Sequence, residues 1–173
     1  MQASSPARDG GNPRQAAARG ACPIGRAAAL LGDYWTLVVL RHATLGFTRF
    51  ERLRDELRIS DNMLADRLNR LVEARLLVRV PYRDRRRTRH EYRLTEAGAA
   101  TEPILLALAA WGQEWTGALR RSGRMEVVHT TCGARVGPGP VCPSCGEVLR
   151  REDQEWVVPW LSEDPMPLAA AAG

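Results

Sequence analysis

The sequence predicts a mainly α-helical chain with one small antiparallel β-hairpin, followed by a small segment built on paired metal-ligand residues. Two short amphipathic helices with a tight break between them are predicted within residues 51–75. An arginine-rich hairpin pattern follows directly, at residues 77–94. Two pairs of histidine and cysteine residues lie at residues 129–145. At 173 residues the chain can bury one apolar core, so we expect one domain with appendages.

The first observation is the pattern of two helices with a break between them. Residues 51–57 have the apolar spacing of a short helix, and Ile59 and Ser60 form the break after it. Ser60 is a good N-cap for a second helix, predicted over residues 61–75. Apolar residues recur along this helix with the 3.6-residue period of an α-helix, so they share one face that should pack on a core. They are Leu64, Leu68, Leu71 and Val72. The opposite face presents polar side chains, namely Asn62, Asp66, Asn69, Arg70 and Glu73.

The second observation is the hairpin that follows. Strands are predicted over residues 77–82 and 91–94, and residues 48–50 are expected to add a short third strand. The loop between the two main strands carries five arginines: Arg83, Arg85, Arg86, Arg87 and Arg89. A polar-faced helix beside a cationic hairpin is typical of a winged helix-turn-helix, in which the helix enters the major groove and the hairpin contacts phosphates.

This arrangement predicts double-stranded DNA as the partner. The second helix and its N-cap supply the candidate base-reading and positioning residues Ser60, Asn62, Met63, Ala65, Asp66, Arg67, Asn69 and Arg70. The hairpin supplies the five wing arginines as phosphate contacts. Asn suits adenine and Arg suits guanine in the major groove, whereas Asp66 and Glu73 would repel phosphates unless they accept from cytosine amino groups. The wing should therefore provide most of the DNA contact energy.

The charge is unevenly distributed along the chain. The net charge of +5 divides into +2 over residues 1–21, +6 over residues 22–123 and −3 over the remainder. A basic centre beside an acidic tail indicates a polyanionic partner for the centre alone. Arginine richness by itself favours DNA only weakly, because all 25 basic residues are arginine and coding bias produces the same composition. The clustering within residues 83–89 is the informative part.

The rest of the chain divides simply. Residues 1–21 are expected to be a disordered basic arm, residues 22–120 the DNA-binding and dimerisation domain, residues 125–161 a zinc-ribbon-like extension and residues 162–173 a flexible tail. Helices are predicted over residues 24–31 and 35–44, with Gly46 ending the second. A long helix is predicted over residues 97–119, with Thr95 as a candidate N-cap. Pro103, near its start, is expected to kink or interrupt it.

The third observation is the set of paired ligands in the C-terminal segment. His129-x2-Cys132 is followed after nine residues by Cys142-x2-Cys145, and a glycine comes directly after Cys132 and Cys145. Four such ligands in two pairs predict a closed, structural zinc site, and the glycines suit the turns of such knuckles. Two alternatives remain open. His129 could be an ordinary surface residue that leaves three thiols and a water, or Cys142 and Cys145 could form a redox disulfide.

The ordered motifs of residues 22–115 resemble those of the HxlR-type winged helix-turn-helix transcriptional regulators. They are Cys22-Pro23, Trp35-Thr36-Leu37, Arg49-Phe50, Ile59-Ser60, a Leu-x3-Leu-x2-Leu run from Leu64, a Tyr-x-Leu-Thr-x-x-Gly run from Tyr92, and Trp111-Gly112. Some members carry similar His-x2-Cys-Gly and Cys-x2-Cys-Gly pairs, which extends the resemblance to about Leu149. The resemblance implies a dimeric regulator that binds DNA sequence-specifically.

In the resembled family the first and last helices form the dimer interface. The wide apolar band of helix 97–119 fits this role, through Leu105, Leu108, Trp111 and Trp115. The alternative is that the two tryptophans fill the core of a single protomer. A dimer of winged helices usually recognises two half-sites, so the operator is expected to be palindromic.

Cys22 is a possible redox sensor, since some HxlR-type members sense oxidants or electrophiles through a cysteine at this position. A helix N-terminus and Arg26 nearby would favour the reactive thiolate. Against this, a cysteine at a subunit interface is more often a small buried hydrophobic residue. A small-molecule effector is also possible.

The function predicted from the sequence is thus that of a DNA-binding transcriptional regulator, with a repressor as the default expectation. The alternative is a winged-helix and zinc-ribbon module that contacts protein partners without specific DNA readout. No glycine-rich phosphate loop, HExxH or GxSxG motif supports an enzyme, and His42 and His90 lie beside no nucleophile or paired carboxylate in the sequence. No apolar run of 18 residues predicts a membrane span, so a cytoplasmic, nucleoid-associated protein is expected.

Overall fold

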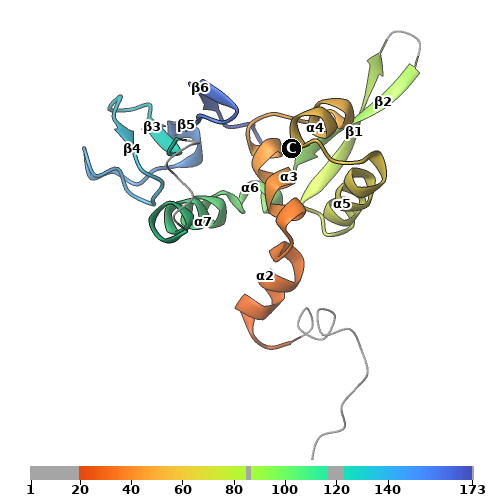
Figure 1. The fold of residues 1–173 in the computed structure, drawn as a ribbon, viewed down its shortest axis with the longest axis horizontal. Coiled ribbons are helices and arrows are strands. Elements are labelled where there is room, and N and C mark those ends of the chain that lie inside the picture. The colour runs from red at the N-terminus through yellow and green to blue at the C-terminus, as the bar shows by residue number, and fades with distance from the viewer. Residues whose placement is uncertain (1–19, 85–86, 117–122, 173) are drawn as a thin grey trace, which may run out of the picture. The chain divides into compact units, whose positions relative to one another are not determined.

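The computed structural model describes residues 20–84, 87–116 and 123–172 (Figure 1). The chain divides into two units, residues 1–37 and 38–173. The first unit contains α2 (Pro23–Leu31) and the beginning of α3 (Tyr34–Thr44). Both helices lie within one residue of their predicted bounds. Cys22 caps α2, with its Sγ accepting a hydrogen bond from the Gly25 N–H at 3.4 Å. The arm expected over residues 1–21 lies outside the described residues, apart from its last two.

The helix-turn-helix of the second unit consists of α4 (Phe50–Leu57) and α5 (Asp61–Glu73). Ser60 is the N-cap of α5, as predicted, and its Oγ accepts from the Met63 N–H at 3.4 Å. The predicted apolar face is confirmed, because Leu64, Leu68 and Leu71 are fully buried. The helix ends two residues before the predicted bound: the Leu76 N–H donates to the Leu71 carbonyl while Arg75 has a left-handed φ of 57°. This is a Schellman ending without the usual glycine, so the sequence did not indicate it.

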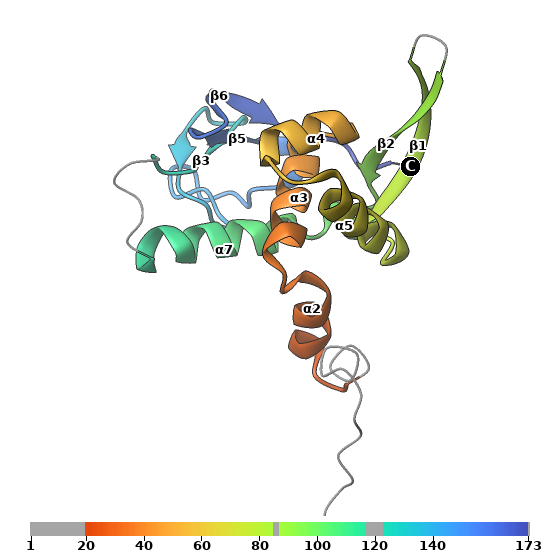
Figure 2. The ribbon, with the colours of Figure 1, turned by 45° about the vertical axis from the view of Figure 1, so that its right-hand side comes forward.

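The wing is a two-stranded hairpin of β1 (Leu77–Asp84) and β2 (Arg87–Leu94) that extends away from α4 and α5 (Figures 1 and 2). Its register runs from Leu77 opposite Leu94 to Asp84 opposite Arg87. The strands are longer than predicted, so the prediction that placed Arg83, Arg87 and Arg89 in a loop is wrong. Arg85 and Arg86 lie outside the described residues.

The predicted third strand at residues 48–50 is reduced to a single β-bridge. Arg49 forms a single antiparallel bridge with Glu91, and the Tyr92 N–H donates to the Thr48 carbonyl at 2.7 Å. Phe50 already begins α4. The described sheet of the wing therefore has two strands.

The helix predicted over residues 97–119 is divided in two. Thr95 caps α6 (Glu96–Ala99), as predicted, by accepting from the Gly98 N–H at 3.1 Å. The chain then turns at Ala100 and Thr101 before α7 (Glu102–Trp115) begins, with Pro103 in its first turn. Proline lacks a backbone N–H and therefore suits the start of a helix rather than its interior. Residues 117–119 lie outside the described residues.

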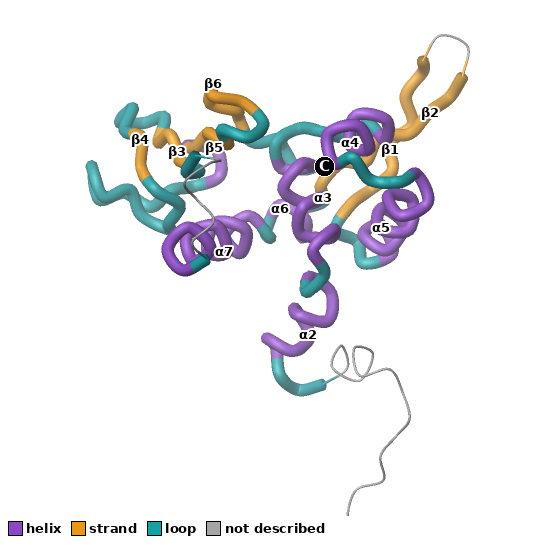
Figure 3. The backbone as a smooth tube through the Cα atoms, viewed as in Figure 1, coloured by secondary structure: helices purple, strands orange, loops and turns teal. Residues whose placement is uncertain are grey.

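The C-terminal segment is a four-stranded antiparallel sheet in the order β4-β3-β5-β6 (Figure 3). The strands are β3 (Glu126–His129), β4 (Arg135–Val136), β5 (Gln154–Val158) and β6 (Ser162–Pro167), with the short helix η1 (Arg151–Asp153) before β5. Val127, Trp156 and Val158 form a small apolar core within it. Within the tail that was expected to be flexible, residues 162–167 instead form β6, which extends the sheet.

Backbone hydrogen bonds join this segment to the winged part of the second unit. The Ala169 N–H donates to the Thr44 carbonyl at 2.8 Å, and the Ala172 N–H donates to the Leu94 carbonyl at 2.7 Å. The guanidinium of Arg151 donates to the Ala169 carbonyl at 2.7 Å. The C-terminal residues thus connect the C-terminal sheet to the end of α3 and to the base of the wing. Within the described parts of the chain, no helix has both the length and the apolar character that crossing a membrane requires.

Candidate nucleic-acid interface and metal site

The exposed face of α5 carries most of the predicted DNA-contacting residues. Asn62, Asp66, Asn69 and Arg70 are all exposed, and so are Ser60 and Met63 next to them. The two other candidates differ, since Ala65 is half-buried and the Arg67 side chain is only 19% exposed. The helix therefore offers one continuous polar face that begins at its N-cap.

Most polar groups on this face are already paired within the protein. Asp66 accepts from Arg70 at 3.1 Å and from Arg67 at 3.2 Å, so one carboxylate pairs with two guanidinium groups and balances one of their two charges. Arg79 of β1 donates to the side-chain oxygen of Asn69. Asn62 forms no side-chain hydrogen bond with any described residue, which leaves its amide available to a base edge at the N-terminal end of α5.

Arg79 is a candidate that the sequence analysis missed. It lies on β1, its guanidinium stacks 5.7 Å from the centre of the Tyr92 ring, and it reaches α5 through Asn69. Alternation along β1 was the available signal, because Arg79, Pro81 and Arg83 are its exposed positions on one face. Arg79 thus links the wing to the exposed face of α5.

The wing arginines are distributed over both faces of the hairpin. The register places Arg83 opposite Thr88 on one face, and Arg87 opposite Asp84 and Arg89 opposite Tyr82 on the other. Arg83 and Arg87 are exposed, whereas Arg89 pairs with Glu51 of α4 and, at 3.2 Å, with Asp84. Arg89 therefore fastens the wing to the helix-turn-helix. Among the described wing arginines predicted to contact phosphates, Arg83 and Arg87 are the two that are exposed, one on each face of the hairpin.

The metal-ligand atoms of the C-terminal segment converge. The Nδ1 atom of His129 lies 3.2 Å from Cys132 Sγ and 3.3 Å from Cys145 Sγ, and Cys132 Sγ lies 3.7 Å from Cys142 Sγ. All four ligand atoms lie within 4.8 Å of one another. A tetrahedral zinc site with bonds of about 2.3 Å to sulfur and about 2.0 Å to nitrogen has edges of about 3.5–3.8 Å. The arrangement fits a four-ligand metal ion, and His129 is a fully buried member of the set rather than a surface residue.

Two similar turns present these ligands. In the first, the Gly133 N–H donates to the His129 carbonyl, and in the second the Gly146 N–H donates to the Cys142 carbonyl, both at 2.8 Å. Gly133 has a φ of 72° and Gly146 a φ of 79°, in the left-handed region that favours glycine. This confirms that the glycine after each second ligand belongs to a knuckle turn.

The thiols of the cluster differ in acidity. Burial raises the pKa of the Cys142 thiol, but the N–H groups of Cys145 and Ser144 and the side chains of Cys145 and Cys132 outweigh it and bring the pKa to about 6. For Cys145 the Glu147 N–H lowers the pKa, while burial and the neighbouring thiols raise it, and the net pKa is raised. Metal binding requires the thiolate form. The Cys142 thiol is therefore the more acidic of these two.

The residues expected at the dimer interface fall into two groups. Leu105 is buried in its own protomer, so it belongs to the core of the second unit. Trp111 and Trp115 are 60% and 72% exposed, and Ile104 and Leu108 are exposed on the same helix. The four exposed residues follow the spacing i, i+4, i+7 and i+11, which is the apolar repeat of helices that pair. Ile104 was missed by the sequence analysis.

Cys22 is exposed, and its thiol is free. Arg26 points back along the chain, with its guanidinium donating to the carbonyls of Gly20 and Ala21 at 3.0 and 2.9 Å. The contact to the Cys22 sulfur comes from the N-terminus of α2, through the Gly25 N–H.

A capped helix-turn-helix with an exposed polar α5, followed by an arginine-bearing hairpin, defines a winged helix-turn-helix DNA-binding transcriptional regulator. The model of the HxlR-like helix-turn-helix family matches residues 30–120, and the chain belongs to that family. Rv3095, an HTH-type transcriptional regulator of Mycobacterium tuberculosis, is 42% identical over 127 residues, which cover 73% of this chain and 78% of Rv3095. The family and its relatives are regulators of transcription rather than enzymes.

Solved structures agree with this membership. The transcription factor candidate PA1607 superposes with a TM-score of 0.63 at 32% identity, covering 80% of this chain and 95% of that one. The redox regulator HypR in its reduced form gives a TM-score of 0.51 at 28% identity, covering 56% of this chain and 95% of that one. The larger coverage by PA1607 indicates that its similarity continues beyond the winged domain.

Proposed function

We propose that the protein is a dimeric, sequence-specific regulator that places α5 in the major groove and the wing on adjacent phosphates. The observation that carries this proposal is the uncommitted amide of Asn62 at the N-terminal end of α5, where a helix-turn-helix approaches base edges. Arg83 and Arg87 supply cations on the wing. Arg70 is a weaker candidate for base readout, because it must leave Asp66 to bind guanine.

Dimer formation is supported by the exposed stripe of Ile104, Leu108, Trp111 and Trp115 on α7. Such a stripe is costly to leave in water and suits a second copy of the same helix. On α2, Ile24 and Leu30 are also exposed, in keeping with a contribution from that helix. A symmetric dimer would bind a palindromic operator. We assign it as a repressor acting at the nucleoid, because a protein bound in the groove over a promoter blocks polymerase.

We further propose that His129, Cys132, Cys142 and Cys145 hold one structural zinc ion. Three thiolates and an imidazole are ligands that zinc prefers, and a closed set of four leaves no position for a reactive water. The convergence of all four atoms supports a metal site over a Cys142–Cys145 disulfide. Cys22 remains the candidate for redox sensing, since its thiol is exposed at a helix N-terminus and HypR is a redox regulator.

A second function rests on the pairing within α5. Because Asp66 pairs with both Arg67 and Arg70 and balances one of their two positive charges, the face is only weakly basic. A weakly basic face suits the competing function, in which the protein contacts a protein partner through α5 and the wing.

Two variants of the proposed DNA surface distinguish these functions. Asn62→Ala should reduce the preference for the protein's own promoter over random DNA by about 1–3 kcal/mol, because it removes a bidentate contact to a base. Arg83→Ala combined with Arg87→Ala should instead weaken binding to both DNAs alike. It should also flatten the dependence of log K on log salt by about 0.9 for each phosphate that is no longer neutralised. Titrations at several salt concentrations measure both effects.

Arg150→Ala is the matched control, since it removes an exposed positive charge from the C-terminal segment. It should leave both the preference and the salt slope unchanged. If wild-type protein showed no preference for its promoter and no salt dependence, the protein-interaction function would replace the proposed one. Weaker binding with an unchanged preference in Asn62→Ala would make Asn62 a positioning contact.

Trp111→Ala should shift the protein from dimer towards monomer and weaken operator binding. Trp111 lies in the middle of the exposed stripe, and a central aromatic residue carries a large share of interface energy, typically about 2 kcal/mol or more. Sedimentation at several concentrations measures the dimer population. Trp160→Ala, at an exposed tryptophan outside α7, is the control and should leave the dimer intact. An undisturbed dimer in Trp111→Ala would place the interface elsewhere.

A further inference from the structure

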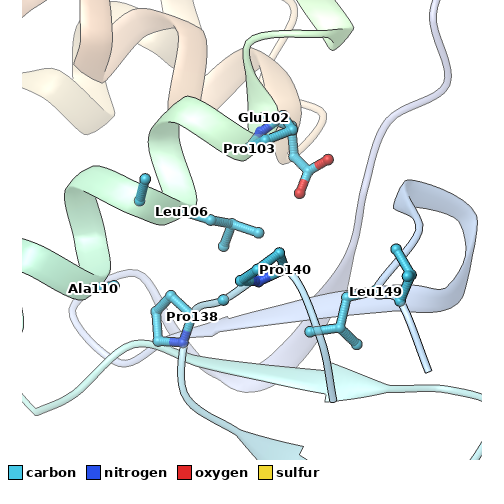
Figure 4. A pocket seen from close by; sticks show the side chains of 10 residues that line it. Glu102, Pro103, Leu106, Ala110, Pro138, Pro140 and Leu149 are labelled. Atoms are coloured by element: carbon cyan, nitrogen blue, oxygen red, sulfur yellow. The ribbon is translucent and has the colours of Figure 1, made fainter. Parts of the chain in front are cut away.

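A cavity of about 390 Å³ lies between α7 and the segment that carries the metal ligands (Figure 4). One wall is formed by α7, through Leu106 and Ala110. The opposite wall is formed by Pro138, Pro140 and Leu149, which flank the second knuckle. Sites for small organic molecules typically measure about 300–1,000 Å³ and are largely apolar with a few fixed polar groups. The size and the lining of this cavity fit that description.

The polar group in this cavity is the carboxylate of Glu102, the first residue of α7. Glu102 is only 6% exposed, yet Figure 4 shows its carboxylate directed into the space between Leu106, Pro140 and Leu149. A hydrogen-bonded chain fixes this orientation: Gln154 Nε2 donates to Glu102 Oε1, and Trp156 Nε1 donates to Gln154 Oε1, both at 3.0 Å. Within the described residues, the second oxygen, Oε2, has no hydrogen-bond donor. The protein thus holds one carboxylate oxygen ready for a ligand.

The charge of Glu102 is incompletely balanced. Burial raises the pKa of its carboxyl, and the Gln154 hydrogen bond and the positive charge of Arg151 offset that effect only in part. Among the described residues Glu102 forms no ion pair, and Arg151 directs a guanidinium N–H to the Ala169 carbonyl instead. A cation that enters the cavity would therefore meet a largely buried carboxylate.

We propose that this cavity binds a small apolar molecule that carries one protonated amine. The ammonium group donates to Glu102 Oε2, and the apolar body packs between Leu106, Ala110, Pro140 and Leu149. A carboxylate-bearing molecule is disfavoured, because it would place two negative charges together in an apolar space. A neutral alcohol can occupy the cavity, but it forms the weaker, uncharged hydrogen bond.

The location of the cavity connects the ligand to two functional parts of the protein. The Leu149 N–H donates to the Pro140 carbonyl at 3.0 Å, and Cys142 and Glu147 are joined by a second such bond at 2.8 Å, so this wall is the base of the metal-binding knuckle. The other wall, α7, carries the stripe proposed for dimerisation. A bound amine would bridge the two, which makes it a candidate effector. That effector role rests on the proposed function, whereas binding itself does not.

Calorimetric titration of the zinc-loaded, full-length protein tests the proposal. The probe is phenylbutylamine, and phenylbutanol and phenylbutyrate are the neutral and anionic isosteres. The amine is expected to bind at least about tenfold more tightly than either isostere, as a charge-assisted bond implies. Glu102→Gln should remove that advantage and leave alcohol binding unchanged. Glu114→Gln, the same change at an exposed position of α7, should behave as wild type.

A second variant keeps the test decisive if Glu102→Gln folds poorly. Ala110→Phe fills the cavity from the α7 side and should abolish binding of both amine and alcohol while the metal content stays unchanged. Amide signals of Leu106 and Leu149 should shift on addition of the amine to wild type but not to this variant. The proposal is overturned if wild type binds no amine, if all three probes bind equally, or if Ala110→Phe still binds. None of these outcomes depends on DNA binding.

Discussion

Replacing Cys142 by serine should release the metal from the protein. Cys142 is fully buried, and its thiol is one of the four ligand groups of the proposed zinc site. A serine hydroxyl is a poor zinc ligand, and the remaining three ligands leave the cation under-coordinated. Structural zinc contributes about 10–16 kcal/mol of apparent binding free energy in zinc-finger peptides, so the loss is large compared with the stability of a small segment. Elemental analysis of purified protein should fall from about one zinc per chain to nearly none.

Loss of the metal should expose residues 125–150 to proteases, because the two knuckle turns depend on it. The winged domain should remain folded on its own apolar core, and DNA binding should persist. The C-terminal sheet should respond unevenly: β5 and β6 retain the buried Trp156 and its hydrogen bond to Gln154, so they should be protected longer than the knuckles.

Cys22→Ser is the matched control for this experiment. It also removes one thiol, but from outside the cluster, and the metal content should stay at the wild-type value. If wild-type protein contained no zinc and Cys142 and Cys145 were isolated as a disulfide, the metal site would be wrong and a redox function would take its place.

The sequence predicted the winged domain well wherever a periodic apolar pattern and a local cap coincided. On α5, Leu64, Leu68 and Leu71 indicated the buried face, and Ser60 indicated the start. The ending was less predictable, because Arg75 adopts a left-handed conformation that a sequence indicates only when glycine occupies it. The backbone conformation of such a residue is set by tertiary contacts rather than by its residue type.

The sequence did not reveal which side chains of the candidate DNA surface are paired with other residues of the protein. A count of arginines could not tell that Arg89 is bound to Glu51 of a different element or that Arg79 reaches Asn69. These contacts join residues far apart in the sequence and depend on the register of β1 and β2. The His129, Cys132, Cys142 and Cys145 cluster was easier to predict, because its members lie in two local turns whose spacing and glycines are visible in the sequence.

Strand β6 of the C-terminal sheet was also not predicted, because its pairing depends on a distant strand. Residues 162–167 contain two prolines and two acidic residues, a composition that favours a loop. They nevertheless pair with β5, where Trp156 lies opposite Met166. A strand at the edge of a sheet tolerates proline, since the missing N–H can face away from the neighbouring strand.

The Tyr-x-Leu-Thr-x-x-Gly motif acquires a physical explanation from the contacts around Gly98. Thr95 Oγ1 donates to the Arg75 carbonyl at 2.6 Å and accepts from the Gly98 N–H, which draws α6 against the turn between α5 and β1. A Cβ atom at Gly98 would overlap the carbonyl oxygen of Leu76 and lie 3.1 Å from Leu94 Cδ2. The Leu76 carbonyl cannot move aside easily, because it also accepts from the Thr95 N–H at 3.1 Å.

Gly98→Ala should therefore destabilise the winged domain strongly. Overpacking a core costs typically about 1–3 kcal/mol, and the upper end or more is expected where the clash is with a hydrogen-bonded backbone. Gly112→Ala on α7 is the matched control: a Cβ atom there meets nothing within 4 Å, and alanine should stabilise the helix by up to about 1 kcal/mol. Denaturant unfolding of both variants measures the difference. Equal stability of the two would mean that α6 can move away from Leu76, and the motif glycine would then need another explanation.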